Sequence, residues 1–219
     1  MLRNSLAVGP VGCNCTVLVC PATHEALIVD PGGDAGRILA LLAKLGARAV
    51  GIVLTHGHFD HILGTREVAA ATGAPVSIHG DDLDLYRGLV RQARYFDLGA
   101  EEPPEPAQIL AGGETLRFGQ LQARVLHTPG HTPGSVSLFI DPASGAPLLL
   151  AGDTLFAGGI GRTDFPGGSF EQIVRSIRDK LFALPDETVV VAGHGPETTI
   201  GEEREHNPDV GRLASGGRD

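Results

Sequence analysis

The chain has 219 residues and a formal net charge of −9, and 42% of its residues are hydrophobic. This composition suits a globular protein with a substantial core and excludes a disordered chain. The acidic balance disfavours a general nucleic-acid binder, and no apolar run approaches the roughly 18 residues of a membrane span. The first residues lack a secretory signal, and an odd number of cysteines (Cys13, Cys15, Cys20) favours a reducing compartment. We therefore expect a cytoplasmic protein with no nucleic-acid or membrane partner.

The first half of the chain alternates short apolar runs with helical patterns. Strands joined by a polar turn are expected at 16–19 and 26–29. An amphipathic helix follows, because apolar residues recur at helical spacing from Ile38 to Leu45 and Gly46 would end it. Next come a strand, a helix and a strand, at 50–54, 66–71 and 76–78.

Asp81 or Asp82 is placed to cap the next helix, and the Pro- and Glu-rich segment 101–106 predicts a loop. Later strands are expected at 121–126, 136–140, 148–151 and 188–192, with a helical stripe from Phe170 to Leu181. Many strands with interspersed helices predict layered sheets covered by helices. No linker interrupts the pattern, so we predict one domain over residues 1–210 and a disordered tail over 211–219.

The most informative stretch is Thr-His-Gly-His-Phe-Asp-His at 55–61, directly after an expected strand. His56 and His58 are two residues apart, so in an extended chain both can converge on one ion. Asp60 and His61 lie where a helix begins and can face a neighbouring ion. Imidazole and carboxylate ligands suit Zn, Fe or Mn, and the lack of a nearby cysteine argues against a structural thiolate site. A polar loop whose histidines cap the next helix is the less favoured interpretation, because this motif is rare by chance.

Three more segments place a metal-ligating residue type just beyond an apolar strand. His131 stands between two prolines, and Asp153 and His194 follow the strands at 148–151 and 188–192. Each alone is typical of a turn. Together, four strands carry five histidines and two aspartates to one rim of the sheets, where catalytic loops usually lie.

These motifs resemble the metallo-β-lactamase superfamily, and above all its glyoxalase II-like hydrolases, over nearly the whole chain. The matching segments are 55–61, Pro-Gly-His-Thr-Pro-Gly-Ser at 129–135, Gly-Asp-Thr-Leu-Phe at 152–156, Gly-Arg-Thr-Asp-Phe-Pro-Gly-Gly at 161–168 and Gly-His-Gly-Pro-Glu-Thr-Thr at 193–199. The resemblance implies an α/β fold, an αββα four-layer sandwich of two mixed sheets flanked by helices. It also implies a dinuclear site, with His56, His58 and His131 on one metal, Asp60, His61 and His194 on the other, and Asp153 as the bridge.

The resemblance implies two divalent metal ions as cofactors, zinc first, with iron or manganese as alternatives. Such a site lowers the pKa of bound water toward roughly 7, so no Ser or Cys nucleophile is required. The nucleophile is then a metal-bound hydroxide, and Asp60 is the side chain to which we assign a catalytic role. The expected activity is hydrolysis of a small-molecule thioester such as S-lactoylglutathione. The oligomeric state is not predicted.

The chain departs from true glyoxalase II enzymes at its C-terminal end and at two tyrosine positions. Those enzymes carry a further helical domain, whereas here about 25 residues follow His194. The family's basic substrate-binding residue is matched by Arg162, but two tyrosine positions hold Asp164 and Pro196. Glutathione thioesters remain the first expectation, with another thioester or an ester as the alternative. Arg162 either binds a substrate carboxylate or braces its own loop by pairing with Asp164.

A second function class, the persulfide dioxygenases, shares the fold but uses one iron held by two histidines and the aspartate. The segment around Arg162 and the tail Glu-Glu-Arg…Asn-Pro at 202–208 resemble these enzymes too. A third hypothesis is a non-catalytic metal-binding relative. The seven filled ligand positions favour the dinuclear hydrolase over both.

The remaining candidates have structural interpretations. His24 is expected in an exposed turn, His79 as a surface or capping group, His127 packed in a strand and His206 on a polar helix. Cys13 and Cys15 are expected as small core residues. Asp30 either orients a metal ligand or caps a turn.

Overall fold

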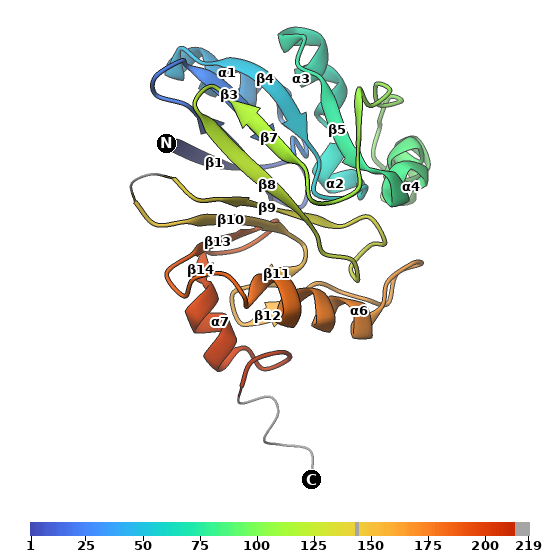
Figure 1. The fold of residues 1–219 in the computed structure, drawn as a ribbon. Helices are drawn as coiled ribbons and strands as arrows, with labels where there is room; N and C mark the ends of the chain where they lie inside the picture. The colour runs from blue at the N-terminus through green and yellow to red at the C-terminus, as the bar shows by residue number, and fades with distance from the viewer. Residues whose placement is uncertain (143–144, 213–219) are drawn as a thin grey trace. The chain divides into compact units, whose positions relative to one another are not determined.

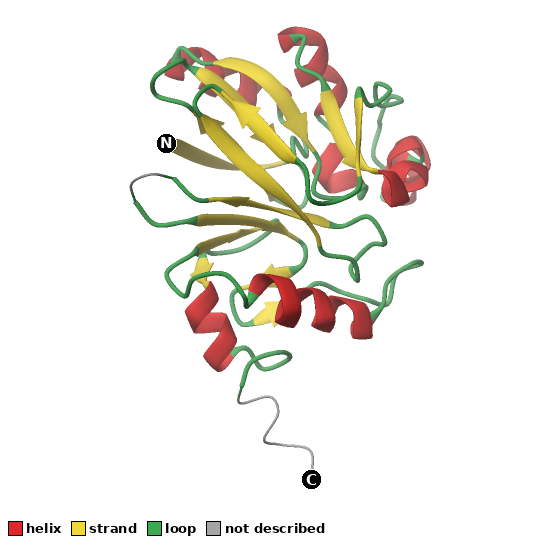
Figure 2. Cartoon of the chain, viewed as in Figure 1, coloured by secondary structure: helices red, strands yellow, loops and turns green. Residues whose placement is uncertain are grey.

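The computed structural model describes residues 1–142 and 145–212. Within it the chain divides into two compact units. The N-terminal unit comprises residues 1–111 and 116–122, and the C-terminal unit comprises 112–115 and the residues from 123 onward. The chain forms two six-stranded sheets, a short two-stranded hairpin and several helices (Figures 1 and 2).

The sheet of the N-terminal unit is mixed. Its order follows the chain, β1 (Leu2–Val8), β2 (Cys13–Val19), β3 (Glu25–Val29), β4 (Arg48–Val53), β5 (Val76–His79) and β6 (Gln108–Leu110). The first three strands are antiparallel, and β3 to β6 are parallel. The helices of this unit are α1 (Ala35–Leu45), α2 (Phe59–Ile62), α3 (Thr65–Thr72), η1 (Gly80–Asp82), α4 (Leu83–Arg87) and α5 (Leu89–Tyr95).

One core holds this unit together. The buried residues Ile38 and Leu42 of α1 and Val68 of α3 pack in the same cluster as strand residues such as Ile28 and Ile52. Helix α1 ends as predicted at Gly46, whose φ of 57° is the left-handed conformation that favours glycine at a helix C-terminus. The apolar helical pattern therefore located both the helix and its end.

The second six-stranded sheet, most of whose strands belong to the C-terminal unit, has the order β14-β13-β10-β9-β8-β7. Its strands are β7 (Thr115–Phe118), β8 (Leu121–His127), β9 (Val136–Ile140), β10 (Leu148–Gly152), β13 (Val189–Ala192) and β14 (Thr198–Thr199). Strands β10 and β13 are parallel, whereas β8–β9, β9–β10 and β13–β14 are antiparallel, so this sheet is mixed as well. A small hairpin joins β11 (Leu155–Phe156) to β12 (Gly159–Ile160).

Three helical segments complete this unit, α6 (Phe170–Arg175), the π-helical segment η2 (Ser176–Leu181) and α7 (Ile200–His206). Ile173, Ile177 and Leu181 are fully buried in one cluster with β10 and β13 residues. Phe170, also in the predicted stripe, is 48% exposed. The three buried residues are four apart, a spacing that keeps one face on the sheet through the wider π-helical turns.

The predicted elements are confirmed with shifts of one to three residues at their ends. The edge strand β1 and the short strands β6, β7, β11, β12 and β14 were missed, because they carry few buried residues or span only two to four positions. Of the predicted tail, Gly211 and Arg212 form backbone hydrogen bonds to Asn207 and Arg204, and residues 213–219 lie outside the described residues. No helix in the described ranges is long and apolar enough to cross a membrane.

Candidate metal centre

The first group of predicted ligands follows β4 in the N-terminal unit. The chain stays extended through His58 (φ −73°, ψ 146°), and α2 begins at Phe59. The ring centroids of His56 lie 4.8 Å from His58 and 4.1 Å from His61, and His61 Nε2 lies 3.8 Å from Asp60 Oδ2. The structure therefore brings these four side chains together within one unit, with His56 and His61 buried.

Asp30 orients one of these histidines. Its carboxylate accepts hydrogen bonds from Thr55 N (2.7 Å) and Thr55 Oγ1 (2.7 Å), and His61 Nδ1 lies 3.0 Å from Oδ2. With the Nδ1 proton donated to Asp30, Nε2 carries the lone pair that a metal requires, and it is the nitrogen on the Asp60 side. The contact between Asp30 and His61 is the one that the orienting interpretation expects.

The buried Cys13 thiol stands beside the same histidine, with Sγ 3.5 Å from His61 Nδ1. Cys13, Asp30 and His61 are close enough to hold a cation, but burial raises the pKa of the Cys13 thiol to about 11. A neutral thiol is a poor metal ligand. Cys13 and Cys15 are both free and buried, as expected of small core residues.

Two further side chains hold the histidine loop, and sequence analysis assigned them no such role. Asp82 accepts a hydrogen bond from Gly57 N (2.8 Å), while Gln92 accepts from Phe59 N (3.1 Å) and donates to Gly57 O (2.9 Å). Asp82 occupies the N-cap position of α4, as predicted, but its side chain forms no capping hydrogen bond there. At the start of η1 the capping side chain is His79, which accepts from Asp81 N. Asp82 is fully buried, and its carboxylate accepts its hydrogen bond from the histidine loop, at Gly57 N.

The second group of predicted ligands lies in the C-terminal unit, where β10 ends before Asp153 and β13 before His194. Asp153 Oδ2 lies 3.7 Å from His131 Nε2 and 3.9 Å from His194 Nε2. Both distances exceed ordinary hydrogen-bonding range, and the three groups converge on one place in this unit. His131 Nδ1 lies 2.7 Å from the carbonyl oxygen of Arg162, which therefore leaves the Nε2 lone pair on the Asp153 side.

A glycine lies against the backbone of each predicted aspartate ligand. A Cβ atom at Gly32 would come 1.8 Å from Asp60 O, and one at Gly161 would come 1.8 Å from Asp153 O. Real Cβ atoms do not approach a carbonyl oxygen this closely, so both positions require glycine. The backbone of each aspartate thus packs closely against the backbone of a glycine, and any residue with a Cβ atom would prevent this contact.

Arg162 turns its guanidinium back onto its own loop. Nε and Nη2 donate to the two carboxylate oxygens of Asp164 (3.0 and 2.7 Å), and the guanidinium lies 4.3 Å from the ring centroid of Phe165. The guanidinium lowers the pKa of Asp164 below its ordinary value. Both side chains are 66% exposed, so solvent screens the pair and a substrate carboxylate can compete for the arginine.

The other histidines have the structural roles expected of them. His24 lies in an exposed turn, and His206 is exposed on α7 beside Glu202. His79 caps η1 and is buried rather than on the surface, and His127 Nε2 lies 2.9 Å from Pro133 O.

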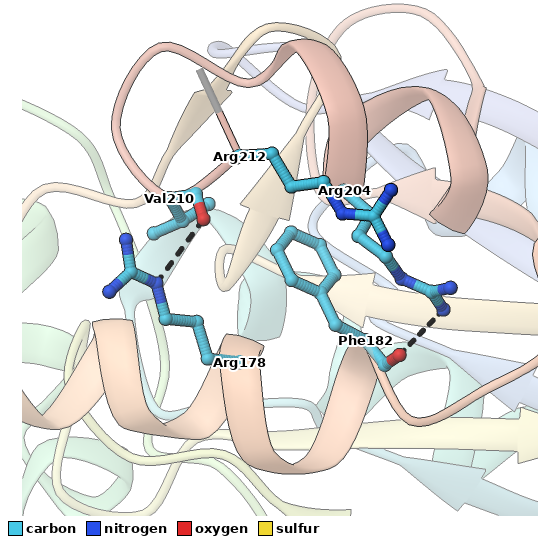
Figure 3. Close-up of a pocket in the computed structure, with 6 residues that line it drawn as sticks. Arg178, Phe182, Arg204, Val210 and Arg212 are labelled. Atoms are coloured by element: carbon cyan, nitrogen blue, oxygen red, sulfur yellow. Dashed lines mark hydrogen bonds between the residues drawn. The ribbon is translucent and has the colours of Figure 1, made fainter. Parts of the chain in front are cut away.

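A cavity of about 360 Å³ in the C-terminal unit contains none of the predicted ligands. It is lined by Arg178, Phe182, Arg204, Val210, Gly211 and Arg212 (Figure 3). The arginines donate to acceptors of the protein itself, Arg178 to Val210 O, Arg204 to Phe182 O and Leu184 O, and Arg212 to Glu205. They therefore tie the C-terminal segment to η2.

The donor set of both groups fits divalent transition metals. Each group offers imidazole nitrogens and a carboxylate, and in each one imidazole has its Nδ1 proton held by an oxygen acceptor. Neutral, oriented imidazole with carboxylate suits Zn, Fe or Mn and is a poor site for Ca or Mg.

Comparisons with known proteins agree with this chemistry. Residues 8–194 match the family model described as the metallo-beta-lactamase superfamily. A hydroxyacylglutathione hydrolase GloC from Haemophilus influenzae is 38% identical over 197 residues, which are 89% of this chain and 91% of that protein.

Two solved structures share the fold. The structure of TTHA1623 in a di-iron-bound form has 36% identity and a TM-score of 0.83, covering 94% of this chain and 98% of that one. ETHE1 from Myxococcus xanthus has 31% identity and a TM-score of 0.79, covering 96% and 84%. The predicted fold class is confirmed, with two mixed sheets flanked by helices.

Proposed function

We propose that this protein, which belongs to the metallo-β-lactamase superfamily, is a dinuclear metal-dependent hydrolase of small-molecule thioesters such as S-lactoylglutathione. The observation that carries the proposal is the Asp153 carboxylate, whose Oδ2 lies 3.7 Å from His131 Nε2 and 3.9 Å from His194 Nε2. A carboxylate so placed suits a bridge between two ions. The hydroxyacylglutathione hydrolase relative supports the reaction class.

The proposed ligand assignment follows the family motifs. One ion is assigned to His56, His58 and His131, the other to Asp60, His61 and His194, and Asp153 to both. Zinc is the first choice, with iron or manganese as alternatives, and the di-iron form of the relative TTHA1623 supports a two-metal site. Five imidazoles and two carboxylates would leave two bound dications with a net charge of about +2, which would stabilise negative charge on the substrate.

When bound, the two ions act as Lewis acids that polarise a carbonyl and lower the pKa of water. The chain itself supplies orientation. Asp30 and the carbonyl of Arg162 hold the Nδ1 protons of His61 and His131, so both rings keep their metal-facing lone pairs. A thiolate is a fair leaving group, and the proposal therefore assigns no side chain as general acid.

The cell compartment and the partners remain part of the proposal. The free, buried cysteines support a cytoplasmic location, and the acidic composition supports the absence of a nucleic-acid partner.

Hydrolysis of S-lactoylglutathione should proceed as fast in air-free buffer as in air, because water is the co-substrate. The measurement is the initial rate with and without oxygen on protein whose metal content has been determined. Turnover that occurs only with a glutathione persulfide and consumes oxygen would refute the hydrolase proposal.

The persulfide dioxygenase is the second candidate, favoured by the ETHE1 neighbour and the segment around Arg162. Metal analysis separates the two candidates. Two ions per chain indicate the hydrolase, and a single iron indicates oxygen chemistry.

Replacing Arg162 with alanine should raise KM for S-lactoylglutathione about ten- to hundredfold with little change in kcat, the effect of losing one charge-assisted contact of roughly 1.5–3 kcal/mol. We propose that the exposed guanidinium exchanges Asp164 for a carboxylate remote from the thioester. Arg175→Ala is the matched control, since this arginine is equally exposed and pairs with Glu171. An unchanged KM, or a joint loss of stability and metal, would assign Arg162 to bracing the loop.

A further inference from the structure

A buried carboxylate connects the segments that follow two of the predicted ligands. Glu203, in α7, is 3% exposed, although its neighbours Glu202 and Arg204 reach solvent. Gly158 N donates to its two oxygens at 3.1 and 3.0 Å, Thr198 Oγ1 donates to Oε1 at 2.7 Å, and Asn207 Nδ2 donates to Oε2 at 2.6 Å. Burial of a carboxylate is costly unless hydrogen bonds compensate it, and here three donors do so.

Gly158 N and Asn207 Nδ2 can only donate, and Gly158 N reaches both carboxylate oxygens, so the site favours a group that only accepts. The orientation of the Asn207 amide is fixed, because its Oδ1 accepts from Asp209 N (3.0 Å) and Val210 N (3.3 Å). Its Nδ2 must therefore face Glu203. Glutamine at position 203 has nearly the same shape, but in either orientation its NH₂ group would face Gly158 N, which can only donate. The substitution Glu203→Gln therefore removes the acceptor chemistry and keeps the volume.

Glu203 and Asn207 together hold the turn of the β11–β12 hairpin. Glu203 accepts from Gly158 N, and Asn207 Nδ2 also donates to Gly159 O at 3.1 Å. The turn lies between the paired residues Phe156 and Gly159, and Gly158 has a φ of +72°. Gly158 N in the turn and Gly159 O at the start of β12 are thus bound by α7 and the residue after it.

The held turn leads directly to Arg162. Strand β12 ends at Ile160, Gly161 packs against the Asp153 carbonyl, and the next residue is Arg162, whose own carbonyl lies 2.7 Å from His131 Nδ1. Glu203 also accepts a hydrogen bond from Thr198 in β14. Strand β14 follows His194 in the chain and pairs with β13, which precedes it. One carboxylate therefore bonds to both segments that leave Asp153 and His194.

We infer that Glu203 is a positioning residue for substrate binding, which acts through the β11–β12 turn on the place of Arg162. This inference rests on the proposed thioester hydrolysis, in which Arg162 meets a substrate carboxylate. Glu203 does not touch the substrate; it keeps the short segment between Gly158 and Arg162 in one conformation.

A double-mutant cycle tests the inference. Glu203→Gln should raise KM for S-lactoylglutathione about tenfold in the wild-type background, with metal content and kcat nearly unchanged. In the Arg162→Ala background the same substitution should change KM less than about twofold, because the group it positions is gone. The control Glu202→Gln, on the exposed neighbour, should change neither. Equal KM factors in both backgrounds would overturn the inference.

Hydrogen exchange of the metal-loaded protein supplies a readout independent of turnover. Amides between residues 157 and 163 should exchange faster in Glu203→Gln than in Glu202→Gln or the wild type. Unchanged exchange there would overturn the inference, even if the wild type hydrolyses no thioester and the proposed function itself fails. Should Glu203→Gln not fold, Glu203→Asp takes its place, since it keeps an acceptor-only group but shortens the reach to Gly158.

Discussion

Asp153→Ala should lose both metal ions and lower kcat/KM for S-lactoylglutathione by about a thousandfold or more. In the proposed site this carboxylate is the one ligand shared by the two ions, and its oxygen faces the imidazoles of His131 and His194. Metal ions contribute several kcal/mol of transition-state stabilisation, and about 4 kcal/mol corresponds to a thousandfold in rate. Metal per chain after dialysis, measured by elemental analysis alongside kinetics, checks the prediction.

His131→Ala is the matched comparison, because His131 is assigned to one ion only. It should lower the occupancy of one site and leave the other ion bound. Asp164→Ala, an exposed carboxylate on the neighbouring loop, should keep both ions. Retention of two ions by Asp153→Ala would remove Asp153 from the metal site.

Asp30→Asn should have the next largest effect, on stability and metal affinity together. Asparagine tolerates the left-handed backbone of this position (φ 52°), so the substitution changes the acceptor chemistry alone. The carboxylate accepts from Thr55 N, Thr55 Oγ1 and His61 Nδ1. The NH₂ group of an asparagine would face at least one of these groups and could not accept its hydrogen bond. Hydrogen bonds to a charged group contribute roughly 1.5–3 kcal/mol each, so we expect a loss of about 3 kcal/mol.

Thermal unfolding of the metal-free protein should show this loss as a fall in Tm of about 9 °C. Affinity for one metal should fall about ten- to hundredfold, because His61 no longer has its Nδ1 proton held. Asp81→Ala serves as the control, since its carboxylate is exposed and should change neither property. Wild-type metal affinity in Asp30→Asn would show that Asp30 only caps its turn.

Local patterns in the sequence determined most of the fold. The helix ending at Gly46 was located because its apolar residues recur at helical spacing. The strands that precede the predicted ligands were located because they are short, continuous apolar runs. The candidate ligands were identifiable for the same local reason, since His and Asp residues recur directly after strand ends. The edge strand β1 was missed because three of its seven residues are exposed, one is buried and its alternation is weak.

Only the tertiary structure decided which polar groups meet across long stretches of chain. The Asp82 side chain accepts from Gly57 N, 25 positions away, instead of forming a capping hydrogen bond in α4. Glu203 is part of a run of charged residues in sequence, yet its side chain is buried against Gly158, 45 positions away. Secondary-structure periodicity depends on neighbours a few residues apart and is legible in the sequence. A hydrogen-bond partner depends on which backbone donors the completed fold leaves to be satisfied, and no local pattern encodes that.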